Sequence, residues 1–156
     1  MTRLYTSDRS ADFVARPTLP QVLGMIGGAR RRILIASFSD IDQRVIEAVC
    51  EASERGVEEI LVVLDRSNCN LARAKRGFPE STRILVNIEP DRRSDMIMHI
   101  KSVVADRSVL IGSSNLSSVA LESNLELSVL VNDDDLALEV VQFVESCVTR
   151  GLLVEH

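Results

Sequence analysis

The feature that most constrains the fold is a pair of buried strands joined by an amphipathic helix. The apolar runs 33–37 (ILIAS) and 58–65 (EEILVVLD) have the length of strands. Between them, Asp40 and Gln43 have the spacing of a capping box, and Gly56 closes the helical segment. The apolar face of this segment repeats at helical intervals and comprises Ile41, Val45, Ala48, Val49 and Ala52. A strand–helix–strand unit of this kind predicts two parallel strands.

The rest of the chain adds elements of both kinds. Helices are expected over 18–28, over 67–75 and after Asp133, and strands over 83–88, 98–106, 109–113 and 124–131. The buried stripe of the last helix should comprise Leu136, Val140, Phe143, Val144, Cys147 and Val148. Together these elements predict an α/β fold, a mixed β-sheet flanked by helices on both faces. We expect a single domain over 1–156 in which residues 1–17 form an irregular N-terminal segment.

The composition excludes several classes of protein. A chain of 156 residues that is 46% hydrophobic fits one globular domain, neither disordered nor fibrous. Its net charge of −5 excludes a generally basic nucleic-acid-coating protein, so an anionic substrate must meet a local basic patch. We find no signal peptide or membrane-spanning run and expect a cytoplasmic protein. No CxxC pair occurs, and free thiols are expected at Cys50, Cys69 and Cys147.

Polar side chains that could carry chemistry gather between residues 99 and 126. On an extended strand, His99 and Lys101 would project from the same side. Because burying two such groups among apolar neighbours is costly, an anionic ligand between them would explain their presence. Asn124 and Glu126 repeat the two-residue spacing on a later strand. Between the pairs lies a turn that combines close backbone approach with hydrogen-bond donors, made of Gly112, Ser113, Ser114 and Asn115.

The pattern His99-x-Lys101-x4-Asp106, followed by the Gly112 turn, resembles the HKD signature of the phospholipase D superfamily. The resemblance extends over nearly the whole chain. In length and in its single motif, the chain is most similar to the small dimeric bacterial endonucleases of that superfamily. The family usually has six residues between the Asp and the Gly, whereas this chain has five, a difference that a tighter hairpin at Arg107 and Ser108 would absorb.

This resemblance implies a phospholipase D-like domain that cleaves phosphodiesters without a metal, through a phosphohistidine. One imidazole attacks phosphorus, and a second protonates the leaving oxygen. The chain has two histidines, and His156 is its last residue, a position that is usually mobile. We therefore expect a homodimer in which two copies of His99 share one site.

The resemblance also implies roles for the other motif residues. Glu126 is expected to orient the His99 ring, and Lys101 and Asn115 to hold the phosphate and stabilise its charge. Asp106 belongs to the catalytic motif, although a turn residue of this type more often anchors nearby backbone. Supporting contacts to the substrate are assigned to Ser113, Ser114 and Asn124.

The expected substrate is DNA or RNA, cleaved with little base specificity. The segment 66–77 contains no acidic residue and is either a solvated face or a groove that follows phosphates, through Arg66, Arg73, Lys75 and Arg76. Two alternatives remain: a phospholipase D-type lipid phosphodiesterase, which would need an exposed apolar surface, and a non-catalytic nucleic-acid-binding subunit with this fold. The sequence predicts no metal site, no cofactor and no membrane partner, and it identifies no helicase or defence-system partner.

Overall fold

The computed structural model describes the backbone of residues 11–14 and, with their side chains, residues 18–88 and 97–156. Within these residues, the strands are β1 (Ala11–Val14), β2 (Arg32–Ser37), β3 (Glu59–Leu64), β4 (Arg83–Asn87), β5 (Ser102–Ala105), β6 (Ser108–Gly112), β7 (Ser128–Asn132) and β8 (Leu153–Glu155). The helices are α1 (Leu19–Gly28), α2 (Gln43–Glu54), α3 (Leu71–Gly77), α4 (Ser118–Glu122) and α5 (Asp134–Thr149).

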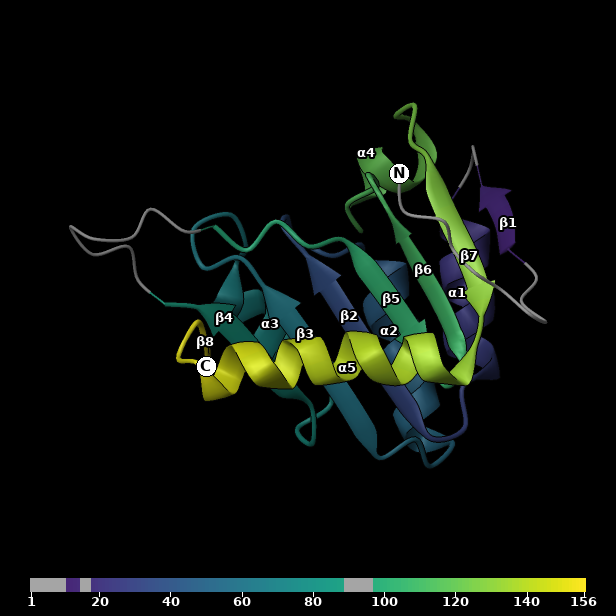
Figure 1. Cartoon of the computed structure of the whole chain (residues 1–156). Coiled ribbons are helices and arrows are strands. Elements are labelled where there is room, and N and C mark those ends of the chain that lie inside the picture. The colour runs from purple at the N-terminus through teal and green to yellow at the C-terminus, as the bar shows by residue number, and fades with distance from the viewer. Residues whose placement is uncertain (1–10, 15–17, 89–96) are drawn as a thin grey trace.

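One mixed sheet contains all of these strands, in the order β1-β7-β6-β5-β2-β3-β4-β8 (Figure 1). The predicted parallel pairing of the strand–helix–strand unit is confirmed, because β2 is parallel to β3. Strand β3 is in turn parallel to β4. The predicted hairpin is also present, with β5 antiparallel to both β6 and β2. Its turn consists of Asp106 and Arg107, since Ala105 pairs directly with Ser108.

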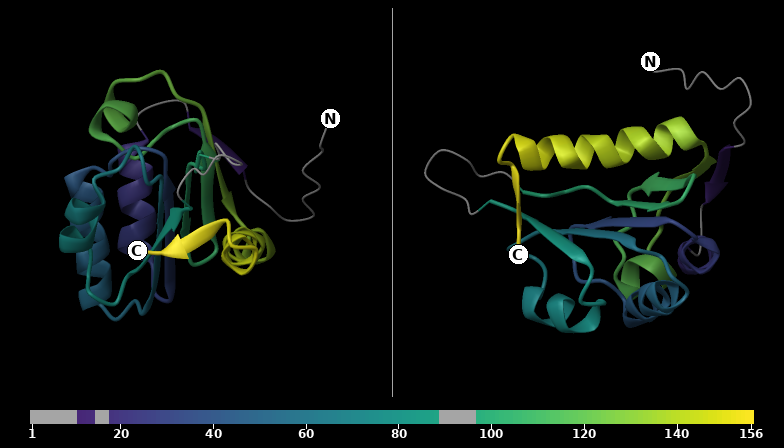
Figure 2. Two further views of the ribbon diagram at one scale, coloured as in Figure 1. Left: turned by 90° about the vertical axis from the view of Figure 1, so that its left-hand side faces the viewer. Right: turned by 90° about the horizontal axis from the view of Figure 1, so that it is seen from below.

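Helices cover both faces of the sheet, which confirms the predicted α/β class. Helix α5 crosses one face, and α1, α2 and α3 lie on the other (Figure 2). Alternate strand residues supply the two cores. Ile33 and Ile35 belong to the core under α1 and α2, whereas Leu34 and Ala36 belong to the core under α5. This alternation follows from the two-residue period of a strand.

Several elements differ from the sequence prediction. Residues 11–14, predicted to be irregular, form strand β1 antiparallel to β7, whereas 1–10 and 15–17 lie outside the described residues. Helix α4 and strand β8 were not predicted. Helix α2 is capped by Asp42, which accepts from Arg44 N at 2.8 Å, because Asp40 instead accepts from Asn70 N. Phe143 is 53% exposed and therefore not part of the buried stripe of α5.

The carboxyl ends of the parallel strands define the edge of the sheet near which His99, Lys101 and the turn after Gly112 lie. β2 ends at Ser37, and α2 begins close by with its cap, Asp42. The amino end of β5 and the carboxyl end of β6 reach the same edge, because Ser102 pairs with both Ala36 and Ile111. Two segments of the chain therefore meet there, 97–101 before β5 and 113–127 after β6.

Candidate active site

His99 and Lys101 share one aromatic neighbour, Phe38. The His99 and Phe38 rings lie edge to face with their centroids 4.7 Å apart. Lys101 Nζ lies 5.3 Å from the centroid of the same ring, within the range of a cation–π contact. The His99 side chain is exposed rather than sealed in the core. The structure thus brings the imidazole and the ammonium together on one aromatic ring at an accessible edge.

The segment that carries both residues is not part of a strand, contrary to prediction, because β5 begins only at Ser102. Its backbone is held by Asp65, a fully buried carboxylate at the end of β3, which accepts from Met98 N at 2.9 Å. The other Asp65 oxygen accepts from Ser67 N and from the backbone and side chain of Asn68. Asp65 was not among the predicted site residues, although a carboxylate directly after a buried strand could have indicated it.

Glu126 was expected to contact the His99 ring, but its carboxylate binds Ser113 and Asn124 instead. Ser113 Oγ donates to Glu126 Oε2, and Asn124 Nδ2 donates to Glu126 Oε1 at 3.1 Å. The structure contains no hydrogen bond between Glu126 and His99 among its described residues. Asn124 and Glu126 also precede strand β7 rather than lie in it. Helix α4 occupies the connection, and Val119 O in this helix accepts from Asn124 N.

The electrostatic setting of Lys101 is determined by burial and by Glu126. Burial lowers the pKa of Lys101 below its ordinary value, and the nearby Glu126 carboxylate partly opposes this effect. The ammonium therefore releases its proton more readily than an exposed lysine does. A bound phosphate would add a second negative charge and favour the ammonium form.

The turn after β6 is held close to both β7 and β2. A side chain at Gly112 would meet Leu127 O at 2.5 Å and Ser128 Cα at 2.6 Å, so this position tolerates no Cβ. Further along, Leu116 N donates to the buried Ser37 Oγ at 3.3 Å, which places Asn115 beside the end of β2. Asn115 Oδ1 is buried without a hydrogen-bond partner within the described structure. This unmatched oxygen is an acceptor, so it requires a donor such as water, whereas contact with a phosphate would use the Asn115 Nδ2 donor.

Ser113 and Ser114 differ in the groups they contact. Ser113 is exposed, and besides binding Glu126 its hydroxyl accepts from Leu127 N at 3.1 Å. Ser114 is buried, and its hydroxyl donates to Asn115 O and Ala120 O. Ser113 therefore belongs to the surface of the site, whereas Ser114 holds the turn in shape.

Asp106 lies at the opposite end of the β5–β6 hairpin from the site. Its carboxylate accepts from the backbone N–H groups of Arg30, Arg31 and Arg32 at 2.8 to 3.0 Å. Burial alone would raise the pKa of Asp106, but these three donors lower it below its ordinary value. The structure thus separates Asp106 from His99 and binds its carboxylate to the backbone before β2.

The four basic residues of the segment 66–77 are divided by the fold. Arg66 N and Nε donate to Asn87, so Arg66 is fixed against the end of β4, directly after Asp65 in the chain. Arg73 is exposed and reaches Gln43 at 3.4 Å, on the rim of a hollow of about 310 Å³ at the start of α2. Lys75 and Arg76 lie in the last turn of α3, where they complement the helix dipole further from the site.

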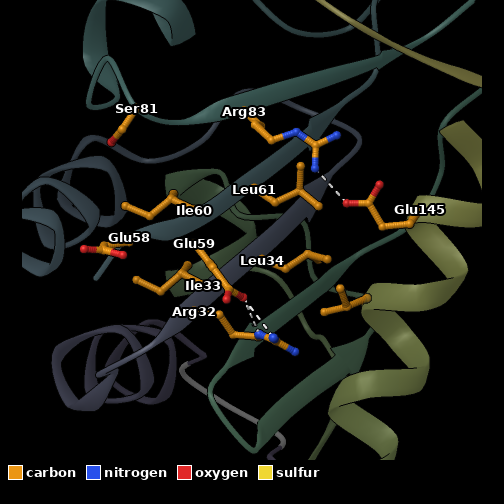
Figure 3. A pocket seen from close by; sticks show the side chains of 11 residues that line it. Arg32, Ile33, Leu34, Glu58, Glu59, Ile60, Leu61, Ser81, Arg83 and Glu145 are labelled. Carbon is orange, nitrogen blue, oxygen red and sulfur yellow. Dashed lines mark hydrogen bonds and ion pairs between the residues drawn. The ribbon is translucent and has the colours of Figure 1, made fainter. Parts of the chain in front are cut away.

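A separate hollow of about 370 Å³ opens at the other edge of the sheet, where the parallel strands begin (Figure 3). It lies between these strands and α5, and ion pairs of Arg32 with Glu59 and of Arg83 with Glu145 cross its rim. None of the predicted site residues lines it. This hollow of about 370 Å³ is therefore separate from the candidate site.

The described residues contain neither a metal-binding cluster nor a membrane-spanning helix. Among the described side chains, no three His, Cys, Asp or Glu residues gather closely enough to hold a metal ion. In the part of the chain that the structure covers, none of the helices combines the length and apolar character needed to cross a membrane. Cys50, Cys69 and Cys147 are free thiols, as predicted.

The sheet topology, with His99 and Lys101 paired at its edge, defines a phospholipase D-like domain. The chain belongs to the family described as "Cardiolipin synthase, PLD-like domain", whose model matches residues 22–148. Cardiolipin synthase A from Yersinia pseudotuberculosis is 26% identical over 139 residues, which cover 86% of this chain. The matched part is 28% of the length of that relative.

Solved structures show the same fold at low sequence identity. NucT from Helicobacter pylori has a TM-score of 0.77 at 18% identity, over 96% of this chain and 100% of that chain. Nuc from Salmonella typhimurium, a phospholipase D family member, has a TM-score of 0.76 at 22% identity, over 96% and 99%. Phosphatidylserine synthase from Haemophilus influenzae has a TM-score of 0.72 at 15% identity, over 95% and 40%.

Proposed function

We propose that this chain is a metal-independent phosphodiesterase that cleaves DNA or RNA through a covalent phosphohistidine at His99. The observation that carries the proposal is the placement of His99 and Lys101 on the Phe38 ring at an exposed edge of the sheet. An imidazole nucleophile needs access to phosphorus, and an adjacent ammonium stabilises the charge that develops on the phosphate oxygens.

The proposed reaction proceeds in two displacements. A His99 nitrogen forms a bond to phosphorus while the bond from phosphorus to the leaving oxygen breaks, and a second imidazole gives that oxygen its proton. The second imidazole then takes a proton from water, whose oxygen attacks phosphorus and breaks the bond to His99. Imidazole suits both roles because its ordinary pKa is about 6.5. Lys101 and Asn115 bind the phosphate oxygens in both steps.

The second imidazole is proposed to come from a second copy of the chain. His156 follows β8 at the outer edge of the sheet, where its N–H donates to Ile84 O, so it does not join the site. Some large apolar side chains near the site are exposed to 44 to 83%. They lie in α4 or close in sequence to the site residues, and they are Ile97, Ile111, Val119, Leu125 and Leu127. A twofold dimer would bury part of this surface and bring two His99 residues together.

A lipid phosphodiester is the second candidate substrate. The same exposed apolar side chains, Leu125 above all at 83%, could contact a bilayer, and the matched relative is named a cardiolipin synthase. Nucleic acid is favoured by the exposed Arg73 and by Arg66, which follows β3 at the same end of the parallel strands. A third candidate, a nucleic-acid-binding subunit without activity, would bind but not cleave.

The test is a substrate panel with EDTA present. Plasmid DNA, single-stranded DNA, RNA and anionic phospholipid vesicles are incubated with the wild type and with His99→Ala. The proposal expects cleavage of nucleic acid by the wild type, inhibition by salt, and none by a folded His99→Ala protein. Lipid cleavage alone would support the second candidate, and binding without cleavage the third.

A mixing experiment tests the shared site. Folded His99→Ala subunits are exchanged into wild-type dimers at increasing ratios. If both histidines are needed, mixed dimers are inactive, and activity falls with the square of the wild-type fraction. A linear decline, or an active monomer in sedimentation analysis, would contradict the dimeric site.

A further inference from the structure

The loop 113–127 between β6 and β7 supplies site residues at both of its ends. Ser113 and Asn115 lie at the start, and Asn124 and Glu126 lie at the finish, with α4 between them. Small movements of α4 would therefore displace residues on both sides of the loop. What fixes α4 against the rest of the protein is thus relevant to the geometry of the site.

Arg44, in the first turn of α2, joins α2 to α4 through two carboxylates. Its Nε and Nη2 donate to the two oxygens of Asp42 at 2.9 and 2.7 Å. Its Nη1 and Nη2 donate to the two oxygens of Glu122, the last residue of α4, at 2.8 Å each. Both contacts are bidentate, the geometry in which a guanidinium binds carboxylates most firmly.

This arrangement differs from an ordinary surface ion pair. Arg44 and Glu122 are about half exposed, but the Asp42 side chain is only 3% exposed. The Arg44 guanidinium holds the pKa of Asp42 far below its usual range, and the two carboxylates raise the pKa of Arg44. Loss of the guanidinium would leave the Asp42 carboxylate buried without its main partner, which is costly.

Other contacts hold the loop more weakly or at other points. Asp42 N donates to Leu116 O at 2.7 Å, and Thr18 N donates to Leu121 O at 3.2 Å. Ala120 and Leu121 are buried in the core side of α4. Asp42 also bonds Ser118, at the start of α4. Within the described residues, the Arg44 contacts span from the buried Asp42 to the end of α4, two residues before Asn124.

We propose that Arg44 is a positioning residue for the active site: its double ion pair with Asp42 and Glu122 holds α4 on α2 and thereby fixes the loop that carries Asn115 and Glu126. The proposal rests on the proposed function of this edge as a phosphodiesterase site. Arg44 acts through the loop and touches none of the reacting groups. Its loss therefore lowers kcat more than it raises KM, because Lys101 lies outside this loop and still binds the phosphate.

The test compares Arg44→Met with a matched control, Arg83→Met. Arg83 is also about half exposed and also bridges two carboxylates, Glu145 and Glu155, but it does so away from the site, on β4. A milder variant, Glu122→Gln, weakens only the α4 side. Arg44→Met is expected to lower kcat by about ten- to a hundredfold, the scale of an ångström-sized misplacement, while Arg83→Met keeps the wild-type kcat.

Hydrogen exchange without substrate gives a second measurement that does not depend on activity. Amides of 113–127 should exchange faster in Arg44→Met, and to a smaller extent in Glu122→Gln, but not in Arg83→Met. Unchanged exchange and kcat in Arg44→Met, faster exchange with an unchanged kcat, or an equal loss of kcat in Arg83→Met would each overturn the proposal. A wild type without cleavage activity would instead overturn the proposed function, while the exchange result would still decide whether Arg44 holds the loop.

Discussion

Asp106 offers a sharp test of the difference between an anchor and a catalytic group. In Asp106→Ala, the backbone N–H groups of Arg30, Arg31 and Arg32 lose their acceptor. Because two of these residues are exposed and water can replace the carboxylate, we take about 0.5 kcal/mol for each bond. Asp106 also has a φ of +50°, which costs alanine about 1 kcal/mol more. The expected destabilisation is therefore about 2 to 3 kcal/mol.

Two further variants separate these contributions. Asp106→Gly removes the carboxylate but accepts the positive φ, so it should recover about 1 kcal/mol relative to alanine. Asp106→Asn keeps one acceptor oxygen and tolerates this backbone region, so it should lose about 1 kcal/mol. Because the native carboxyl has a lowered pKa, its contribution is present above the unfolded value near 3.9 and is lost as pH falls through the native value.

The assay is urea unfolding between pH 7 and pH 3, together with kcat measured where each variant is folded. We expect the largest loss of stability for alanine, a smaller one for glycine and the smallest for asparagine. All three variants should show a smaller acid dependence and, where folded, a wild-type kcat. A fully stable Asp106→Asn protein without activity would refute the anchoring role and return Asp106 to the catalytic groups.

Three other predictions follow from named contacts. Gly112→Ala should destabilise the protein by about 1 to 3 kcal/mol in urea, because its Cβ meets Leu127 and Ser128 backbone; a wild-type midpoint would contradict this. Glu126→Gln should lower the pKa of Lys101 further, measured by NMR of the Lys101 ammonium with Lys75 as the internal control; an increase would contradict the opposing role of Glu126. Phe38→Leu should reduce kcat by about tenfold with less than about 1.5 kcal/mol of lost stability, and an unchanged kcat would show that the ring does not orient His99.

The sequence predicts the regular part of this fold well because its core patterns are strong. The apolar runs of β2 and β3 and the helical period of α2 specify a parallel unit without help from distant residues. Strand β8 was not predicted because three residues are too few to show a strand pattern, and this strand depends on pairing with β4. Phe143 fits the helical period of the buried stripe, but the flank of α5 on which it lies is exposed.

The sequence points to candidate site residues but not to the local structure that holds them. His99 and Lys101 lie before β5 rather than in a strand, and their segment contacts Asp65 and Phe38, which are distant in sequence. Likewise, the pairing of Glu126 with Ser113 depends on how α4 folds the loop, and no local pattern reveals it. Contacts between segments that are far apart along the chain were therefore the part that the sequence could not supply.

The stereochemical course at phosphorus tests the central claim most directly. A phosphodiester substrate made chiral at the scissile phosphorus, by a sulfur and an oxygen isotope, is cleaved with EDTA present, and the configuration of the product is determined. Two successive displacements, the first by His99 and the second by water, predict retention of configuration. Inversion would show that water attacks the substrate directly, and the phosphohistidine at His99 would then be excluded.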